Sequence, residues 1–119
     1  MKDVVRRAGE NVSCQEVEAV LRDQPGVLDA AVIPRPDPIR GEELWAFLQV
    51  EEVPTQPHLV RERAEAVLRG AREALARHKL PRYVSLVDRF ERTPTERIVK
   101  RRLAEWGEQV PTYDFGERR

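Results

Sequence analysis

The most informative chemical feature of this sequence is a cation that follows a rigid turn. The sequence Thr-Pro-Thr occupies positions 93–95 and is followed by Glu96 and Arg97. Because proline fixes its own φ angle, a turn of this composition directs the next side chains outward. The basic groups here could contact phosphates, or they could form the solvated face of a short helix, as most charge runs do. These groups are Arg97, Lys100, Arg101 and Arg102.

Side chains that bind metals or act as nucleophiles are scattered along the chain. His58, His78 and the single cysteine, Cys14, do not have the spacing of a metal site. His78 falls near the end of a predicted helix, where a protonated imidazole interacts favourably with the helix dipole. Cys14 falls on the apolar face of another predicted helix, which is typical of a small core residue. We therefore predict no metal site and no nucleophilic triad.

Length and composition limit the function classes. The 119 residues suffice for one domain, and 21 basic residues balance 21 acidic ones. A net charge of zero gives no long-range attraction to nucleic acid or to an anionic membrane. No apolar run approaches the roughly 20 residues that span a bilayer, and no signal peptide opens the chain. With one cysteine no intrachain disulfide forms, so we expect a cytoplasmic protein. The abrupt start suggests a fragment of a longer one.

Hydrophobic periodicity predicts an α+β fold: a small, mostly antiparallel three-stranded sheet with a short N-terminal strand pair, packed against two to three helices. A capping box at Ser13 and Glu16 begins the first helix. We expect the first long strand to stop at Pro34, before a turn-rich connection. The predicted elements are strands at 27–33, 44–51 and 83–90, a long helix at 58–79, a short basic helix ending near 107, and a loosely held polar tail at 108–119.

Two elements have clear burial patterns. Alternation in the strand 44–51 places Trp45 and Phe47 on one face and the other apolar side chains on the opposite face. The long helix carries one apolar stripe. Its members are Val60, Ala64, Val67, Leu68, Ala71 and Leu75.

Four segments together carry a family resemblance. They are a Lys-Asp stretch leading to Gly-Glu-Asn at 2–12, a Pro-Asp-Pro-Ile-Arg-Gly-Glu connection within 30–42, a Lys-Leu-Pro joint within 78–84, and the turn and basic segment at 93–103. In this order and spacing they resemble the C-terminal domain of the adenylate-forming superfamily of acyl-CoA synthetases, peptide-synthetase adenylation domains and luciferases. The resemblance covers residues 2–105. It implies a lid domain at 1–107, followed by the tail at 108–119.

The resemblance implies a two-step reaction that uses ATP, Mg²⁺ and CoA. A small carboxylic acid attacks the α-phosphate of ATP, and a thiol, usually that of CoA, then displaces AMP. The partner is an N-terminal adenylation domain of the same polypeptide, which holds ATP, Mg²⁺ and the acid. We therefore expect the isolated domain to be inactive and to bind no cofactor alone.

The resemblance also assigns roles to residues. Arg97 stands where the family has a catalytic lysine, and Glu96 stands where it has glycine. Lys2 stands at the hinge. The loop Gly9-Glu10-Asn11 would face the thiol-transfer site, with Gly9 beside the pantetheine arm. Lys79 and Arg82 could meet the CoA phosphates, although ordinary surface charge explains both as well.

Three functions remain open. The chain is the lid of an acid–CoA ligase, the lid of an adenylation domain that serves a carrier protein, or a catalytically impaired homologue in which Glu96 and Arg97 have abolished adenylation. The variant at 96–97 and the end of the chain are most similar to crotonobetaine/carnitine-CoA ligase-like proteins. The resemblance implies that the pocket that selects the acid lies on the other domain.

Overall fold

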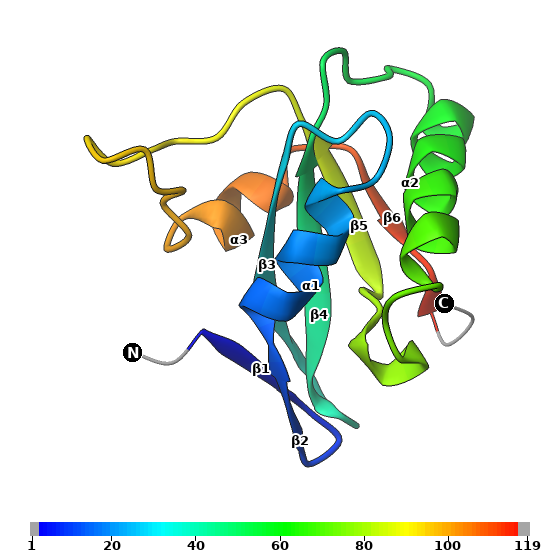
Figure 1. The fold of residues 1–119 in the computed structure, drawn as a ribbon, viewed down its shortest axis with the longest axis vertical. Coiled ribbons are helices and arrows are strands. Elements are labelled where there is room, and N and C mark those ends of the chain that lie inside the picture. Colours follow the sequence, from blue (N-terminus) through cyan, green and yellow to red (C-terminus); the bar gives the residue numbers. More distant parts are fainter. Residues whose placement is uncertain (1–2, 117–119) are drawn as a thin grey trace.

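A long antiparallel hairpin forms the centre of the sheet. In the computed structural model, which describes residues 3–116, β3 (Asp29–Asp37) pairs with β4 (Gly41–Gln49) along its whole length. β4 also pairs in parallel with β5 (Tyr83–Val87), and β5 pairs with β6 (Thr112–Asp114). The hairpin of β1 (Val4–Arg7) and β2 (Glu10–Ser13) joins β4 at its first residue. The result is one six-stranded mixed sheet (Figure 1).

β3 continues past the point where the sequence predicts its end. Pro34 and Pro36 both lie inside the strand, opposite Leu44 and Glu42 of β4. The N–H of Val32, two residues before Pro34, points away from β4 and donates to the Glu18 carboxylate. The direction of the N–H repeats every two residues along a strand, so the nitrogen atoms of Pro34 and Pro36 also face away from β4. The N–H that each proline lacks would therefore make no ladder bond to β4. The prediction that the strand stops at Pro34 was therefore wrong.

Two helices cover one face of the sheet. α1 (Cys14–Arg22) begins at Ser13, whose hydroxyl accepts from the N–H of Glu16 at 3.3 Å, as the capping box predicts. α2 (Pro57–Ala71) packs beside it, and every member of its predicted apolar stripe is buried. Alternate β4 side chains complete this cluster, including Leu44, Ala46 and Leu48.

The other face carries a smaller core. Trp45 and Phe47 point to this side, as the alternation predicts, and pack with Ile33 and Phe90. The five-residue helix α3 (Leu103–Gly107) covers them with Leu103. The indole N–H of Trp45 donates to the Ser85 hydroxyl at 2.8 Å, which fixes the ring. The α+β fold class is confirmed.

Several element boundaries differ from the prediction. α2 ends at Ala71, and a 3₁₀ turn η1 (Arg77–Lys79) follows; the apolar pattern runs on because Leu75 stays buried beyond the helix. β5 ends at Val87. The expected basic helix is reduced to α3, because Ile98 forms a bridge with Arg92 and the N–H of Val99 donates to the Glu91 carbonyl.

The segment after residue 107 is not loosely held where it forms β6, which adds an antiparallel strand to the sheet. Tyr113 and Phe115 pack edge to face beside the main core, with ring centroids 4.7 Å apart. The division into a lid domain at 1–107 and a tail at 108–119 remains a prediction. Lys2, the predicted hinge, lies outside the described residues. No helix within residues 3–116 has the length and apolarity to cross a bilayer.

Candidate functional site

The segment that carries Arg97 is a tight, hydrogen-bonded turn. The N–H of Glu96 donates to the Thr93 carbonyl at 2.9 Å, and the N–H of Thr93 donates to the Arg97 carbonyl at 2.8 Å. The Thr93 hydroxyl accepts from the N–H of Arg97 at 3.1 Å. The segment therefore folds as a small hairpin that projects from the domain (Figure 1). Such a turn holds its side chains in fixed directions.

Arg97 is exposed at the end of this hairpin. Within residues 3–116, its guanidinium makes no hydrogen bond or ion pair, including none with the neighbouring Glu96. By contrast, Arg92 and Lys100, which flank the turn, are paired with carboxylates. The turn thus presents one unpaired cation to whatever approaches it.

Arg92 fixes the stem of the hairpin. Its guanidinium donates to Asp29 of β3 at 2.8 Å and to the Glu96 carbonyl at 3.1 Å. A third contact reaches Gln49 of β4 at 3.3 Å. One side chain therefore links the turn to both central strands, and planar guanidinium suits such multiple contacts. The sequence pattern did not point to Arg92.

Glu96 keeps a glycine-like backbone. Its φ angle is 66°, in the left-handed region that glycine adopts freely and other residues adopt at a cost of about 1–2 kcal/mol. The position where the family resemblance places glycine thus retains the conformation despite the substitution. The turn that aims Arg97 is preserved, and the change adds an exposed carboxylate beside it.

Replacing Glu96 with glycine is expected to stabilise the domain by about 0.5–1 kcal/mol. The relief of left-handed strain exceeds the entropy that glycine adds to the unfolded chain. Urea unfolding measures the difference. Thr95→Gly, in the same turn but without a positive φ angle, is the control and should destabilise. Equal effects of the two substitutions would contradict the assigned backbone conformation.

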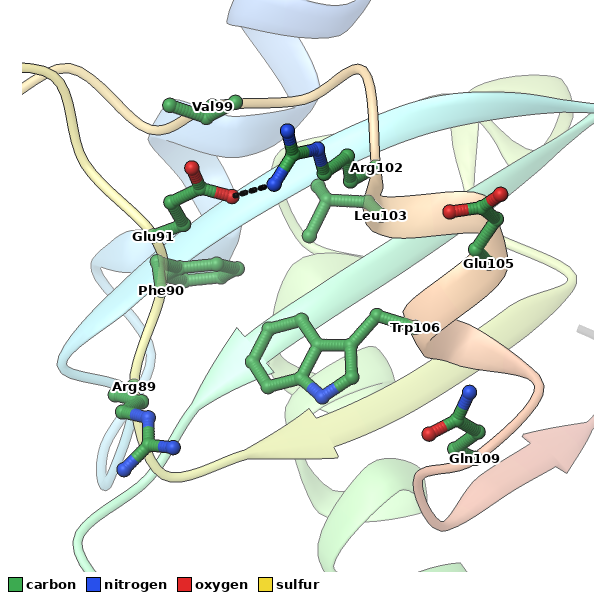
Figure 2. A pocket seen from close by; sticks show the side chains of 9 residues that line it. All are labelled: Arg89, Phe90, Glu91, Val99, Arg102, Leu103, Glu105, Trp106 and Gln109. Atoms are coloured by element: carbon green, nitrogen blue, oxygen red, sulfur yellow. Dashed lines mark ion pairs between the residues drawn. The ribbon is translucent and has the colours of Figure 1, made fainter.

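A hollow of about 370 Å³ lies against the stem of the Arg97 hairpin. Phe90, Leu103 and Trp106 form its apolar wall, and Glu91 and Arg102 face each other across the rim at 3.9 Å (Figure 2). Its walls are the segments that enter and leave the hairpin. Packing in this hollow therefore helps to set the direction of the turn.

The Gly9 loop lies at the other end of the domain (Figure 1). Ala8 and Gly9 have φ angles of 51° and 83° and form the two-residue turn between β1 and β2. Consecutive positive φ angles match the twist of a tight hairpin. A Cβ atom added at Gly9 would meet nothing within 4 Å, so the space beside this backbone is open.

The other residues that the resemblance assigns to CoA binding or thiol transfer lie at this same end. Glu10 faces His78 of η1, with Oε2 and Nε2 3.1 Å apart. Lys79 donates to the Glu16 carboxylate at 3.0 Å, and Asn11 accepts from Arg6 at 2.9 Å. The structure thus brings η1 beside the β1–β2 hairpin. The Arg97 hairpin is remote from this group.

Arg82 is already engaged within the domain. It donates to Asp114 of β6 at 2.9 Å and lies 3.6 Å from Asp37. The hydrogen bond with Asp114 raises the pKa of Arg82 above its ordinary value. Burial alone would raise the pKa of Asp114, but the hydrogen bonds from Arg82 and from the N–H of Gly116, together with the nearby arginine charges, outweigh burial and lower that pKa. Arg82 therefore has a clear structural role in holding β6.

Cys14 is a core residue, as predicted. It is fully buried, and burial together with the nearby Asp3 charge raises the pKa of its thiol to about 12. A thiol this far from ionisation is not a nucleophile at neutral pH. Within residues 3–116, no group of three His, Cys, Asp or Glu side chains is placed to hold a metal ion.

Residues 16–97 match the family described as AMP-binding enzyme C-terminal domain. The chain is 32% identical over 113 residues to the acetyl-coenzyme A synthetase of Bacillus subtilis, covering 95% of this chain and 19% of that protein. It is 41% identical over 103 residues to triostin synthetase I of Streptomyces triostinicus, covering 87% and 18%.

The solved structures agree. Apo MatB from Rhodopseudomonas palustris superimposes with a TM-score of 0.75 at 31% identity, covering 88% of this chain and 20% of that one. The chain belongs to the AMP-binding enzyme C-terminal domain family, whose relatives here are adenylate-forming enzymes and acyl-CoA synthetases. It spans about a fifth of the length of the curated relatives that it matches.

Proposed function

We propose that this chain is the mobile C-terminal lid of an ATP-dependent acid–CoA ligase. The observation that carries the proposal is the separation of two exposed turns, with unpaired Arg97 on one and Gly9 on the other. Turns at remote ends of one rigid domain do not serve one active site at the same time. A domain that rotates on a hinge would offer each in turn, as a two-step reaction requires.

In the first step a carboxylate oxygen bonds to the α-phosphorus of ATP, and the bond to pyrophosphate breaks. Negative charge builds on the oxygens around that phosphorus. The Arg97 guanidinium, held by the 93–97 turn, is proposed to stabilise this charge where water is excluded. Its planar fork suits phosphate oxygens. Mg²⁺, when bound with ATP, shields the phosphate charges, and its ligands are expected on the upstream domain.

In the second step the thiol sulfur of CoA bonds to the acyl carbon, AMP leaves, and the thiol proton passes to solvent. The open space beside Gly9 supports its proposed place next to the pantetheine arm. Glu10 and Asn11 would line the same passage. Lys79 and Arg82 lie at this end, and since both already hold carboxylates, they would bind CoA phosphates only by sharing or exchanging those partners. Location in the cytoplasm stays a prediction from the single cysteine.

The experiment compares the full-length protein that carries this domain with the domain alone. With a panel of small carboxylic acids, the full-length protein should release pyrophosphate and then consume CoA, and the isolated domain should do neither. Transfer to a carrier-protein thiol, with CoA inert, would favour the carrier-directed alternative. Full-length protein that is folded and binds ATP but turns over no acid would overturn the proposal and favour an impaired homologue.

A further inference from the structure

Lys100, unlike the exposed Arg97, is held by carboxylates from distant segments of the chain. Its ammonium is partly buried and donates to both oxygens of Asp3, at 2.8 and 3.0 Å, and to the Val32 carbonyl at 3.1 Å. It also forms an ion pair with the Glu18 carboxylate. Glu18 is itself only 6% exposed and accepts from the N–H of Val32 at 2.8 Å. The Glu18 carboxylate and the Lys100 ammonium thus form hydrogen bonds with the N–H and the carbonyl of Val32, respectively.

These contacts join three segments that are distant in sequence. Asp3 directly follows Lys2, the predicted hinge, and precedes β1. Glu18 lies on α1, and Lys100 lies three residues after Arg97. Between Arg97 and Lys100 the chain pairs with the segment that enters the turn, through the Ile98–Arg92 bridge and the Val99–Glu91 hydrogen bond. A continuous set of bonds therefore runs from the residue next to the hinge to the turn that holds Arg97.

The ammonium stays charged in this setting. Burial alone would lower its pKa, but hydrogen bonds to Asp3 and Glu18 outweigh that effect and raise the pKa of Lys100. The cluster is thus a charged, hydrogen-bonded joint, and charge-assisted bonds of this kind have strict geometry. An apolar side chain at position 100 could fill the space but could not hold Asp3.

We propose that Lys100 is a positioning residue that couples the segment after the predicted hinge, through Asp3, to the Arg97 turn. Rotation at the hinge would then carry Arg97 to one defined place. The proposal rests on the proposed function, because it assigns Lys100 a role only in the adenylation step. Lys100 does not touch the substrates. It acts through the orientation of the turn, and a misplacement of about 1 Å in a charge-stabilising group costs up to about 100-fold in rate.

The test measures both half-reactions in the full-length protein. Lys100→Met should slow acyl-adenylate formation about 10- to 100-fold, with the KM for ATP nearly unchanged, and should leave thiol transfer from supplied acyl-adenylate intact. Asp3→Asn, a milder change at the exposed partner, should slow the same step. Val67→Ala, which truncates a buried side chain of α2 that takes no part in the Lys100 contacts, controls for lost stability and should not separate the two steps.

A double-mutant cycle separates this proposal from the proposed function. In an Arg97→Ala background, Lys100→Met should add little, because its effect passes through Arg97. If Arg97→Ala slows adenylation while Lys100→Met has no effect, slows both steps alike or adds its full effect to Arg97→Ala, the coupling role is refuted and the lid function stands. If Arg97→Ala itself has no effect, the proposed function fails first.

Discussion

Replacing Arg97 with alanine in the full-length protein is expected to slow acyl-adenylate formation by about 100- to 1,000-fold. Removing one preorganised group that stabilises transition-state charge typically has an effect of this size. Arg97 is exposed and makes no ion pair within residues 3–116, so the substitution removes no contact that holds the domain together. Initial rates of pyrophosphate release measure the effect. The stability of the domain should not change.

Two further variants complete this experiment. Arg63→Ala removes an exposed arginine from α2, on a different part of the domain, and should leave the rate unchanged. Arg97→Lys restores the residue type that the family resemblance implies and should retain most of the rate. A rate for Arg97→Ala within about twofold of the native rate would show that this guanidinium has no catalytic role. Activity that appears only in Arg97→Lys would favour the impaired homologue.

Replacing Gly107 with alanine is expected to destabilise the domain by about 3 kcal/mol, at the upper end of the usual cost of overpacking. A Cβ atom at this position would lie 2.2 Å and 2.5 Å from two ring carbons of Trp45 and 2.9 Å from the ring of Phe47. The indole cannot easily move aside, because it is 2% exposed and hydrogen-bonded to Ser85. Either α3 must shift or the ring must leave its place.

Urea unfolding, monitored by tryptophan fluorescence, measures this effect. Glu105→Ala changes an exposed position on the same helix and should alter the free energy of unfolding by no more than about 0.5 kcal/mol. Equal stability of Gly107→Ala and Glu105→Ala would mean that α3 is not packed on the Trp45 face. Because α3 lines the hollow beside the Arg97 hairpin, Gly107→Ala should also slow adenylation in whatever fraction stays folded.

The fold class was predictable because local patterns agree with global packing. Alternation around Trp45 placed the two faces of β4 correctly, and the stripe on α2 identified its buried side. The ends of helices and strands were harder to predict where tertiary contacts override the local sequence pattern. Proline ends most strands, yet Pro34 and Pro36 lie within β3. A strand accepts proline where the N–H would face an edge without ladder bonds. β6 has only three residues and too little apolar pattern to be recognised.

The candidate site was predictable only in part. The Thr-Pro-Thr turn indicated that Arg97 points outward, and the structure places it there. A signal for Glu96 also existed, since a glycine position often marks a positive φ angle. The roles of Arg92 and Lys100 could not be predicted from the sequence, because their partners are distant in sequence. Lys100 and Asp3, for example, are 97 residues apart. Ion pairs between distant segments leave no local pattern.

If the two turns serve different chemical steps, substitutions in them should impair different half-reactions. Both half-reactions are measured at single turnover in the full-length protein for Arg97→Ala and Gly9→Leu. Gly26→Leu is the matched control, because Gly26 has a φ angle of 82°, close to the 83° of Gly9, and equally open surroundings. Leucine at position 26 brings the same backbone strain in the loop between α1 and β3, away from the β1–β2 turn (Figure 1).

We expect a crossed result. Arg97→Ala should lose acyl-adenylate formation and keep thiol transfer from supplied acyl-adenylate, whereas Gly9→Leu should do the reverse and Gly26→Leu should keep both. Loss of the same half-reaction in Arg97→Ala and Gly9→Leu, or equal effects of Gly9→Leu and Gly26→Leu, would contradict the division of labour between the two ends of this domain.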